Sequence, residues 1–368
     1  MQASLARRSL LTALFAAPAA GTSLPPPDAA VHLLNRTSFG VDEPALTRLR
    51  AIGAAAYVDE QLHPDALDDT ALDGVLARLT TLTLSNAELV QTYAKAEPGQ
   101  RQLPLRELRA ATVLRQRYSR RQLFEVLVEF WSNHFNVTHS DGRARYYKTG
   151  DDRDVIRAHA LGRFADLLRA SARSPAMLVY LDNASNVVDG PNENYARELL
   201  ELHTLGVDGG YGEDDVKEIA RCFTGWGLRN HEYHFFANRH DYGAKLVLGH
   251  RLPANRGEED GEAVLDLLAA HPSTARHLAR KLLCRFVEDA PTDAAVEAIA
   301  AVFTASGGDI RATVAAVLHS ADFRNSADRK FRRPAEYLTA CLRASGAVMD
   351  GEAGLRPLVA ALAAQGQT

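Results

Sequence analysis

The chain has 368 residues, of which 46% are hydrophobic and 24% are charged, a composition typical of globular proteins rather than of disordered or fibrous ones. Its 42 basic and 46 acidic residues give a formal net charge of -4, so it lacks the strong basic excess of a dedicated nucleic-acid-binding protein. The cysteines Cys222, Cys284 and Cys341 are too widely spaced for a zinc motif or a disulfide framework. Buried free thiols are expected, with one disulfide as the alternative.

The first 19 residues have the three-part layout of a signal peptide. Arg7 and Arg8 form a basic start, an apolar stretch covers residues 10–17, and residues 17–19 offer a small-residue cleavage site. The adjacent arginines indicate the twin-arginine export route, with an ordinary Sec signal as the alternative. Residues 20–27 contain three consecutive prolines, which is typical of a stiff linker. We therefore expect an exported protein, periplasmic or extracellular.

From residue 28 to 368 we expect a single helical domain, because apolar residues recur at the 3.6-residue spacing of helices. Asp309 is a natural N-terminal cap and Gly53 a natural C-terminal one. No later segment has about 18 consecutive apolar residues, so no transmembrane span is expected. Helices are predicted over residues 28–35, 43–52, 54–62, 105–117, 121–134, 154–160, 164–172, 192–206, 261–270, 273–287, 294–305 and 310–319, and after Pro175 and Pro334.

One segment departs from this helical pattern. Two short apolar runs, 234–236 and 245–248, flank a polar stretch that contains Gly243. Such a pattern predicts a small β-hairpin within residues 233–248. The expected fold is therefore mainly α, a large irregular multi-helix domain with one small β-hairpin.

Several segments together resemble the exported bacterial family known as domain of unknown function 1800, and the resemblance extends from about residue 28 to the end. The block Pro191–Gly206 is the most specific part. The resemblance implies an exported helical protein of unassigned activity, often encoded beside a sulfatase-like family, which makes such a protein a possible partner. The segments are His32–Gly40, Glu129–Asn136, Arg157–Gly162, Ser174–Asn183, Pro191–Gly206, Thr224–Trp226, His240–Asp241 and Arg276–Lys281.

The resemblance fails at the end of the sequence. Members of the family usually continue into a proline- and glycine-containing tail, and this sequence stops at Thr368, where that tail should begin. We therefore expect the domain to lack the tail, together with any part of a site that the tail completes.

The predicted helix 192–206 is the first candidate site. Four leucines supply its buried side, while Asn194, Arg197, Glu198 and Glu201 share another face, because side chains three and four residues apart meet on a helix. Glu198 and Glu201 could hold one divalent metal ion or act as an acid–base pair. The alternative is an ion pair between Arg197 and Glu201, with Glu198 bonded to another helix. Asn194 and Arg197 are candidate binding residues.

His134 is the second candidate, as a proton-transfer or metal-binding residue at the end of a half-buried helix. Its spacing from Glu129 matches neither the HExxH zinc pattern nor the ExxH di-iron pattern. A buried histidine bonded to a backbone carbonyl is the structural alternative.

His240 and Asp241 form the third candidate, a metal-binding pair at the turn of the predicted hairpin. The alternative is a turn-forming aspartate beside a solvated histidine. Trp226 is grouped with the candidate binding residues. His159, His203 and His277 also lie on predicted helices, and each is a weak signal alone.

Two functions fit these patterns. The first is an exported, metal-dependent enzyme with a carboxylate–histidine site between helices, using Glu198 and Glu201 with His134 and His240 as neighbours in one polar cleft. The second is a non-catalytic partner or assembly factor for another exported protein, such as the sulfatase-like neighbour. An enzyme requires the candidate residues to converge in one cleft, whereas a partner requires an exposed apolar patch.

Overall fold

The computed structural model describes residues 28–138 and 142–347. The predicted signal peptide and linker, and the end of the sequence from residue 348, lie outside the described residues. Within the described part the fold is mainly helical, as the sequence predicts. None of the helices in this part of the chain is both long and apolar enough to cross a membrane.

The helices begin and end close to the predicted positions. Asp309 caps α18 as expected, since its carboxylate accepts a hydrogen bond from the Ala312 N–H at 2.8 Å. The helices are α2 (Ala29–Thr37), α3 (Glu43–Ile52), α4 (Ala54–Leu62), α5 (Thr70–Leu76), α6 (Asn86–Tyr93), α7 (Pro98–Arg101), α8 (Leu103–Tyr118), α9 (Gln122–His134), α10 (Lys148–Gly150), α11 (Phe164–Arg173), α12 (Pro175–Tyr180), α13 (Asn194–Glu198), α14 (Glu213–Cys222), α15 (Glu259–Ala269), α16 (Pro272–Phe286), α17 (Asp293–Ala305), α18 (Ile310–His319), α19 (Ala321–Arg324) and α20 (Pro334–Ala344).

Two π-helical turns extend these helices. Asp151–Arg157 continues α10, and Leu199–His203 continues α13. A π-helical turn places about one more residue in each turn than an α-helix does, so the side chains after it move to a different face. Both turns position charged or titratable groups that are described below.

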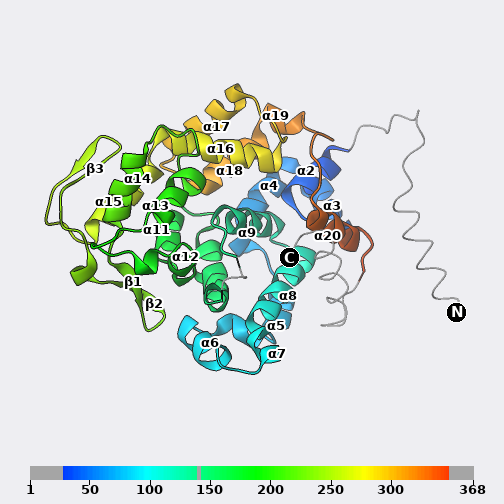
Figure 1. Cartoon of the computed structure of the whole chain (residues 1–368). Coiled ribbons are helices and arrows are strands. Elements are labelled where there is room, and N and C mark those ends of the chain that lie inside the picture. The colour runs from blue at the N-terminus through cyan, green and yellow to red at the C-terminus, as the bar shows by residue number, and fades with distance from the viewer. Residues whose placement is uncertain (1–27, 139–141, 348–368) are drawn as a thin grey trace.

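Helix α9 lies at the centre of the molecule, with other helices on several sides of it (Figure 1). Its predicted apolar face is buried throughout, including Trp131, which is 1% exposed. The Trp131 indole N–H donates a hydrogen bond to the Ala160 carbonyl at 3.0 Å. Because α9 belongs to the large hydrophobic cluster that joins α2 to α18, its C-terminal residue His134 is held in the core.

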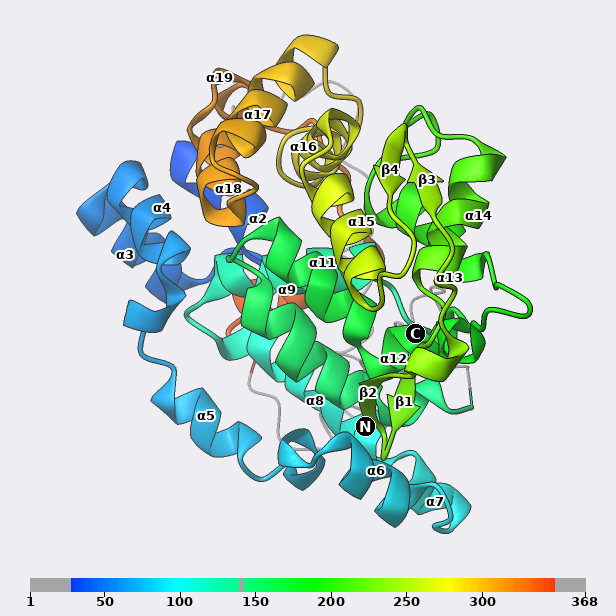
Figure 2. The ribbon, with the colours of Figure 1, turned by 90° about the vertical axis from the view of Figure 1, so that its left-hand side faces the viewer.

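Helices α5, α6 and α7 form an arm along one edge of the molecule (Figure 2). The arm has a small apolar cluster of its own, in which Leu72 and Leu76 of α5 pack on Ala111 of α8. The two strand pairs and α14 lie on another side, beside α15 (Figure 2).

The strands pair differently from the prediction. β1 (Trp226–Arg229) pairs with β2 (Glu232–Phe235), and β3 (Lys245–Val247) pairs with β4 (His250–Leu252), so the runs predicted to pair with each other belong to separate hairpins. Each hairpin has a two-residue turn in which both residues have positive φ. Such turns match the twist of the adjoining strands and favour local pairing over a longer loop. The turn residues are Asn230 (54°), His231 (68°), Leu248 (48°) and Gly249 (78°).

The first and last described helices lie on the same side of the molecule (Figure 1), and the segment that follows α2 contacts α20. Arg343 of α20 donates from Nε to the Gly40 carbonyl at 2.8 Å and forms an ion pair with Asp42 at 2.7 Å. Gly40 approaches α20 so closely that a Cβ atom there would lie 2.6 Å from the Ala340 Cα. The core is therefore closed by segments about 300 residues apart in the sequence.

Candidate functional site

The helix predicted over residues 192–206 is interrupted in a way that changes its buried face. After α13, the π-helical turn Leu199–His203 places Leu202 outside, where it is 50% exposed, and His203 inside, where it is 4% exposed. Leu202 was expected in the core, because an uninterrupted α-helix would have placed it beside Leu199. Because of this turn, the His203 side chain faces the core at the place where the Leu202 side chain was expected.

The end of this helix leaves backbone carbonyls that need hydrogen-bond donors, as every helix C-terminus does. Two of the donors are histidines from other helices. His134 Nε2 lies 3.0 Å from the His203 carbonyl oxygen, and His277 Nε2 lies 3.2 Å from the Leu202 carbonyl oxygen. Since a carbonyl only accepts, both Nε2 atoms carry the proton. The helix end is thus held by α9 and α16 together.

Lys281 of α16 binds the other nitrogen of His134. Its Nζ lies 2.8 Å from His134 Nδ1, which accepts because the ring proton is on Nε2. His134 is 3% exposed, and burial, followed by the charge of Lys281, holds its pKa well below the usual 6.5. The histidine is therefore a neutral acceptor with a fixed tautomer.

Two more imidazoles complete what we call the Lys–His cluster: His134, His203, His277 and Lys281. The ring centroids of His203 and His277 lie 6.0 and 6.1 Å from that of His134. Burial lowers the pKa of His203 to about 3 and also lowers that of His277. The cluster thus contains three neutral rings in an environment that disfavours charge.

Burial also lowers the pKa of Lys281, to about 8. Among the described residues no carboxylate forms an ion pair with this ammonium group. A lysine that is partly desolvated and lacks a counter-ion loses its proton more readily than an exposed one. Lys281 is therefore the residue of the cluster whose proton is exchangeable near neutral pH.

Glu198 and Glu201 are half-buried on the helix that His134 caps. Burial, and then the charge of Glu201, raises the pKa of Glu198. The structural alternative predicted an ion pair between Arg197 and Glu201, and this pair does not form. The Arg197 guanidinium forms two hydrogen bonds of 2.8 Å with Glu213 and a weaker one of 3.3 Å with Glu193. Both candidate carboxylates are thus left without the arginine.

The other candidate binding residues have structural contacts. Asn194 is exposed at the start of α13, and its N–H donates to the Asn192 side chain at 2.9 Å. Trp226 is fully buried, and a Cβ atom on Gly261 would lie 2.5 Å from its ring. These two residues are not brought to the Lys–His cluster by any contact within the described residues, and their binding role remains a prediction.

His240 and Asp241 belong to a separate polar cluster. Asp241 accepts hydrogen bonds from Arg221 on both carboxylate oxygens, at 2.7 and 3.2 Å, and this pairing lowers the pKa of Asp241. His240 is 3% exposed, with Nδ1 2.8 Å from the Thr224 carbonyl oxygen. A metal ion at Asp241 would have to displace the arginine, so metal binding by this pair stays a prediction.

The cluster around His240 holds the second hairpin to α15. Lys245 of β3 is 2% exposed and donates to Asp260 of α15 at 2.7 Å. His240 Nε2 lies 3.5 Å from the same carboxylate oxygen of Asp260. Buried charges are stable only when paired, as here. This arrangement accounts for the buried lysine structurally.

Among residues 28–138 and 142–347, no group of three or more His, Cys, Asp or Glu side chains is arranged to hold a metal ion. The cysteines Cys222, Cys284 and Cys341 are free, as the first of the two sequence interpretations predicted, but only Cys222 is buried and the other two are half-buried. The Lys–His cluster therefore offers three imidazoles and one amine rather than a closed set of metal ligands.

Sequence reasoning identified His134 but missed Lys281 as a site residue. One signal was present: His277, Lys281 and Arg285 are spaced by four residues, so they share one face of α16. The positions on α9 that face them are His134 and Glu129, whose carboxylate lies 3.8 Å from Arg285. Only the packing of α9 against α16 shows that these polar faces meet.

Comparison with known proteins gives one match. The family model described as "Protein of unknown function (DUF1800)" matches residues 32–368. No curated protein and no solved structure matches this chain. The match covers both π-helical turns, the Lys–His cluster and nearly all of the remaining described residues. The chain therefore belongs to the DUF1800 family.

Proposed function

We propose that the protein is an exported enzyme that transfers protons at the Lys–His cluster, with Lys281 as the acid–base group. The observation that carries this proposal is the partly buried Lys281 amine, whose pKa is lowered to about 8 and which bonds to a neutral His134. A general base or acid works best when its pKa lies near the working pH. An amine with such a pKa can also attack a carbonyl group.

The histidines of the cluster have a positioning role in this proposal. His134 receives the Lys281 N–H at 2.8 Å and gives its own proton to the His203 carbonyl, so it fixes where the amine lies. Phe130, Trp131 and Phe135 surround the His134 ring. These rings bury His134, and burial also lowers the pKa of the Lys281 amine that bonds to it.

The metal-dependent form of the proposal would use the two carboxylates. Burial and the charge of Glu201 raise the pKa of Glu198, and a divalent cation between two such groups would relieve their repulsion. Neither glutamate has an ion pair with Arg197. Elemental analysis of the protein from its native compartment distinguishes the two forms: a stoichiometric metal that is lost in Glu201→Gln supports the metal-dependent one.

The titration of Lys281 tests the acid–base proposal directly. The chain has six lysines, so a protein labelled with ¹⁵N and ¹³C in lysine gives few side-chain amine signals. We expect one of them to titrate with a midpoint of about pH 8, where an unperturbed lysine titrates near 10.4. The measurement is the Nζ chemical shift between pH 6 and pH 11.

Two variants assign that signal. Lys281→Arg should remove the signal that titrates near pH 8, whereas Lys95→Arg, which changes an exposed lysine, should remove a different one. If every lysine signal titrates above pH 9.5, Lys281 carries its proton throughout the physiological range, and the acid–base role is ruled out.

We also propose that export uses the twin-arginine route. The supporting feature is the adjacent pair Arg7 and Arg8 before an apolar run. Replacing both with lysine should leave uncleaved precursor in the cytoplasm, measured by fractionation and immunoblotting. The same two changes at Arg48 and Arg50, outside the signal, should leave export normal. Normal export of the Arg7→Lys, Arg8→Lys variant would instead indicate the Sec route.

The second candidate function is a non-catalytic partner of an exported protein. It stays a prediction from the resemblance stated above. Large exposed hydrophobic side chains occur in several segments, including Val207 at 71% and Leu246 at 56% exposure. Single exposed apolar residues of this kind are common on soluble proteins. The convergence of titratable groups at the Lys–His cluster is why we place the enzyme first.

A further inference from the structure

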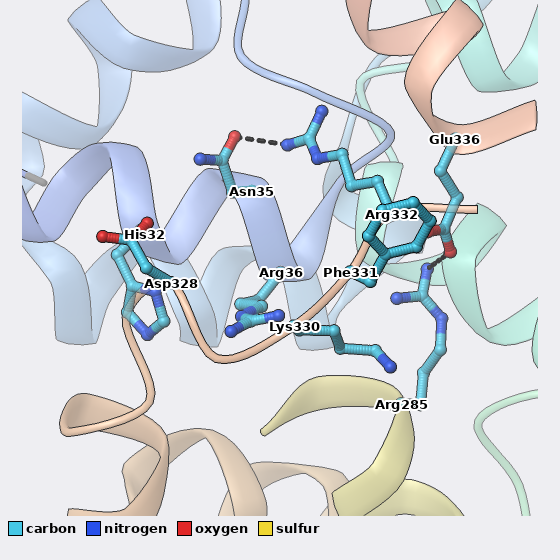
Figure 3. Close-up of a pocket in the computed structure, with 9 residues that line it drawn as sticks. All are labelled: His32, Asn35, Arg36, Arg285, Asp328, Lys330, Phe331, Arg332 and Glu336. Carbon is cyan, nitrogen blue, oxygen red and sulfur yellow. Dashed lines mark hydrogen bonds and ion pairs between the residues drawn. The ribbon is translucent and has the colours of Figure 1, made fainter. Parts of the chain in front are cut away.

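A cavity of about 230 Å³ lies beside α2 and the start of α20, and none of the four residues of the Lys–His cluster lines it (Figure 3). It is lined by residues from α2, α16 and α20 and from the loop before α20. The lining residues are His32, Asn35, Arg36, Arg285, Asp328, Lys330, Phe331, Arg332 and Glu336. Ligand pockets for drug-sized molecules are about 300–1,000 Å³, so this cavity suits a smaller group.

The lining carries more positive than negative charge. Four side chains are basic and two, Asp328 and Glu336, are acidic. The carboxylate of Glu336 lies 3.4 Å from Arg285 and 2.8 Å from Arg333 outside the lining. Lys330 pairs with Asp289, also outside the lining, at 2.6 Å. The acidic groups near the cavity are therefore shared among several cations.

Two of the four basic residues have no ion pair among the described residues. Arg36 is 7% exposed and donates to the Ser326 backbone carbonyl at 2.7 Å. Arg332 donates to the neutral Asn35 side chain at 2.5 Å. Figure 3 shows Arg332 turned toward Asn35 while Arg36 lies beside Lys330. Arg36 is buried and Arg332 is half-buried, and charges withdrawn from water are usually paired or coordinated, so these two guanidinium groups favour an anion between them.

A third basic residue has an unused donor. The Arg285 side chain is 10% exposed, and its Nε atom has no hydrogen-bond partner among the described residues, although it lies 3.8 Å from the Glu129 carboxylate. Burial, and then the charges of Arg285 and Arg332, lowers the pKa of Arg36. Burial is also the largest cause that lowers the pKa of Arg332. The cations around the cavity therefore repel one another, and an anion placed among them would offset that repulsion by attracting each of them.

We infer that this cavity binds one small oxyanion, a carboxylate, sulfate or phosphate group, among Arg36, Arg285 and Lys330. Guanidinium groups bind such oxyanions through two parallel hydrogen bonds, and lysine adds a point charge. Arg332, which also lines the cavity and is turned toward Asn35, adds positive charge to the lining. The bound group would lie near the surface-exposed Phe331, which is 81% exposed, so the rest of a larger ligand could extend past that ring.

This site does not require Lys281 to take part in a reaction. Arg285 follows Lys281 by four residues on α16, which places the two about 6 Å apart along the helix axis. If the enzyme proposal also holds, the cavity is where an anionic substrate would be held. If it fails, the cavity remains a binding site for an anionic ligand.

The test uses three anions with the wild-type protein. Phosphate, sulfate and acetate are titrated at constant ionic strength, with chloride as the compensating salt, and binding is followed by calorimetry and by thermal unfolding. We expect saturable binding and an increase in Tm of about 2 °C at saturation for at least one anion. Binding of phosphate and sulfate identifies a tetrahedral group, whereas binding of acetate alone identifies a carboxylate.

Matched variants locate the binding. Lys330→Gln removes a cavity cation that lies on a loop. The affinity of this variant for the bound anion should fall about tenfold, a typical loss for one charged hydrogen bond. Arg332→Gln should weaken binding less. Arg48→Gln changes an arginine that is about half exposed and lies outside the cavity, and it should bind like the wild type. Equal affinity in Lys330→Gln, or no binding beyond that of chloride, would overturn the inference.

Discussion

Replacing Arg157 with methionine is expected to lower the free energy of unfolding by about 3–5 kcal/mol, the cost of leaving a buried charge without its partner. Arg157 lies at the end of the first π-helical turn and is 13% exposed. Its guanidinium donates to both oxygens of Glu125 at 3.0 and 2.7 Å, and to Asp152 at 3.0 Å. Methionine keeps much of the volume but supplies none of these three hydrogen bonds.

The charges explain why the effect is large. Burial alone would lower the pKa of Arg157, but the two carboxylates raise it overall. Glu125 is 6% exposed within α9, so it cannot recover its hydration when the arginine is removed. Chemical denaturation at pH 7 measures the loss.

Two variants separate this explanation from a general loss of packing. The double variant Glu125→Gln, Arg157→Met should recover part of the lost stability, because it also removes one unpaired negative charge. Arg50→Met, which breaks the exposed ion pair with Asp28, should change stability by less than about 1 kcal/mol. A loss at Arg157 no larger than that at Arg50 would contradict the buried-charge account.

Acidification below pH 6 is expected to destabilise the protein steeply, because His134 and His203 are buried as neutral rings. An unfolded imidazole takes up a proton below about pH 6.5, whereas folded His203 does so only near pH 3. Between these values the unfolded state binds more protons, so the free energy of unfolding falls as the pH falls. The slope is roughly 1.4 kcal/mol per pH unit for each such histidine.

The measurement is the free energy of unfolding in urea at pH 7, 6, 5 and 4. His203→Phe removes one titrating group, so its slope between pH 6 and pH 4 should be lower by roughly 1.4 kcal/mol per pH unit. His63→Asn changes a histidine whose side chain is 53% exposed and should leave the slope unchanged. Identical slopes for His203→Phe and the wild type would show that His203 is not the source of the acid sensitivity.

Helix positions could be predicted from the sequence, because caps and apolar spacing are local signals. Glu43–Ile52 and Ile310–His319 were predicted with the bounds that the structure has. The hairpins were mispaired because their turns depend on positive φ at Asn230, His231 and Leu248. In these three residues positive φ is uncommon, and their sequence signal is weaker than that of an Asn-Gly turn.

The candidate site could be predicted only in part. His134 was identified because it ends an apolar helix, but its partners come from two other helices. His203 enters the core because a π-helical turn rotates the chain after Glu198, and helical periodicity assumes no such turn. The cavity that carries Arg36 and Arg332 joins residues almost 300 positions apart, a contact that no local pattern specifies.

The meeting of α2 with the chain around α19 and α20 constrains the order in which the protein can fold. His32 and Arg36 of α2 are bonded to the Phe323 and Ser326 carbonyls, and Arg343 binds the Gly40 carbonyl. During synthesis, the first helix emerges from the ribosome long before any of these partners exists. Helix α2 also packs on α3 and α9, which are made early, but the buried His32 and Arg36 lack these carbonyl partners until the last segments are made. Such a nascent chain depends on chaperones for longer than one built from sequential local units.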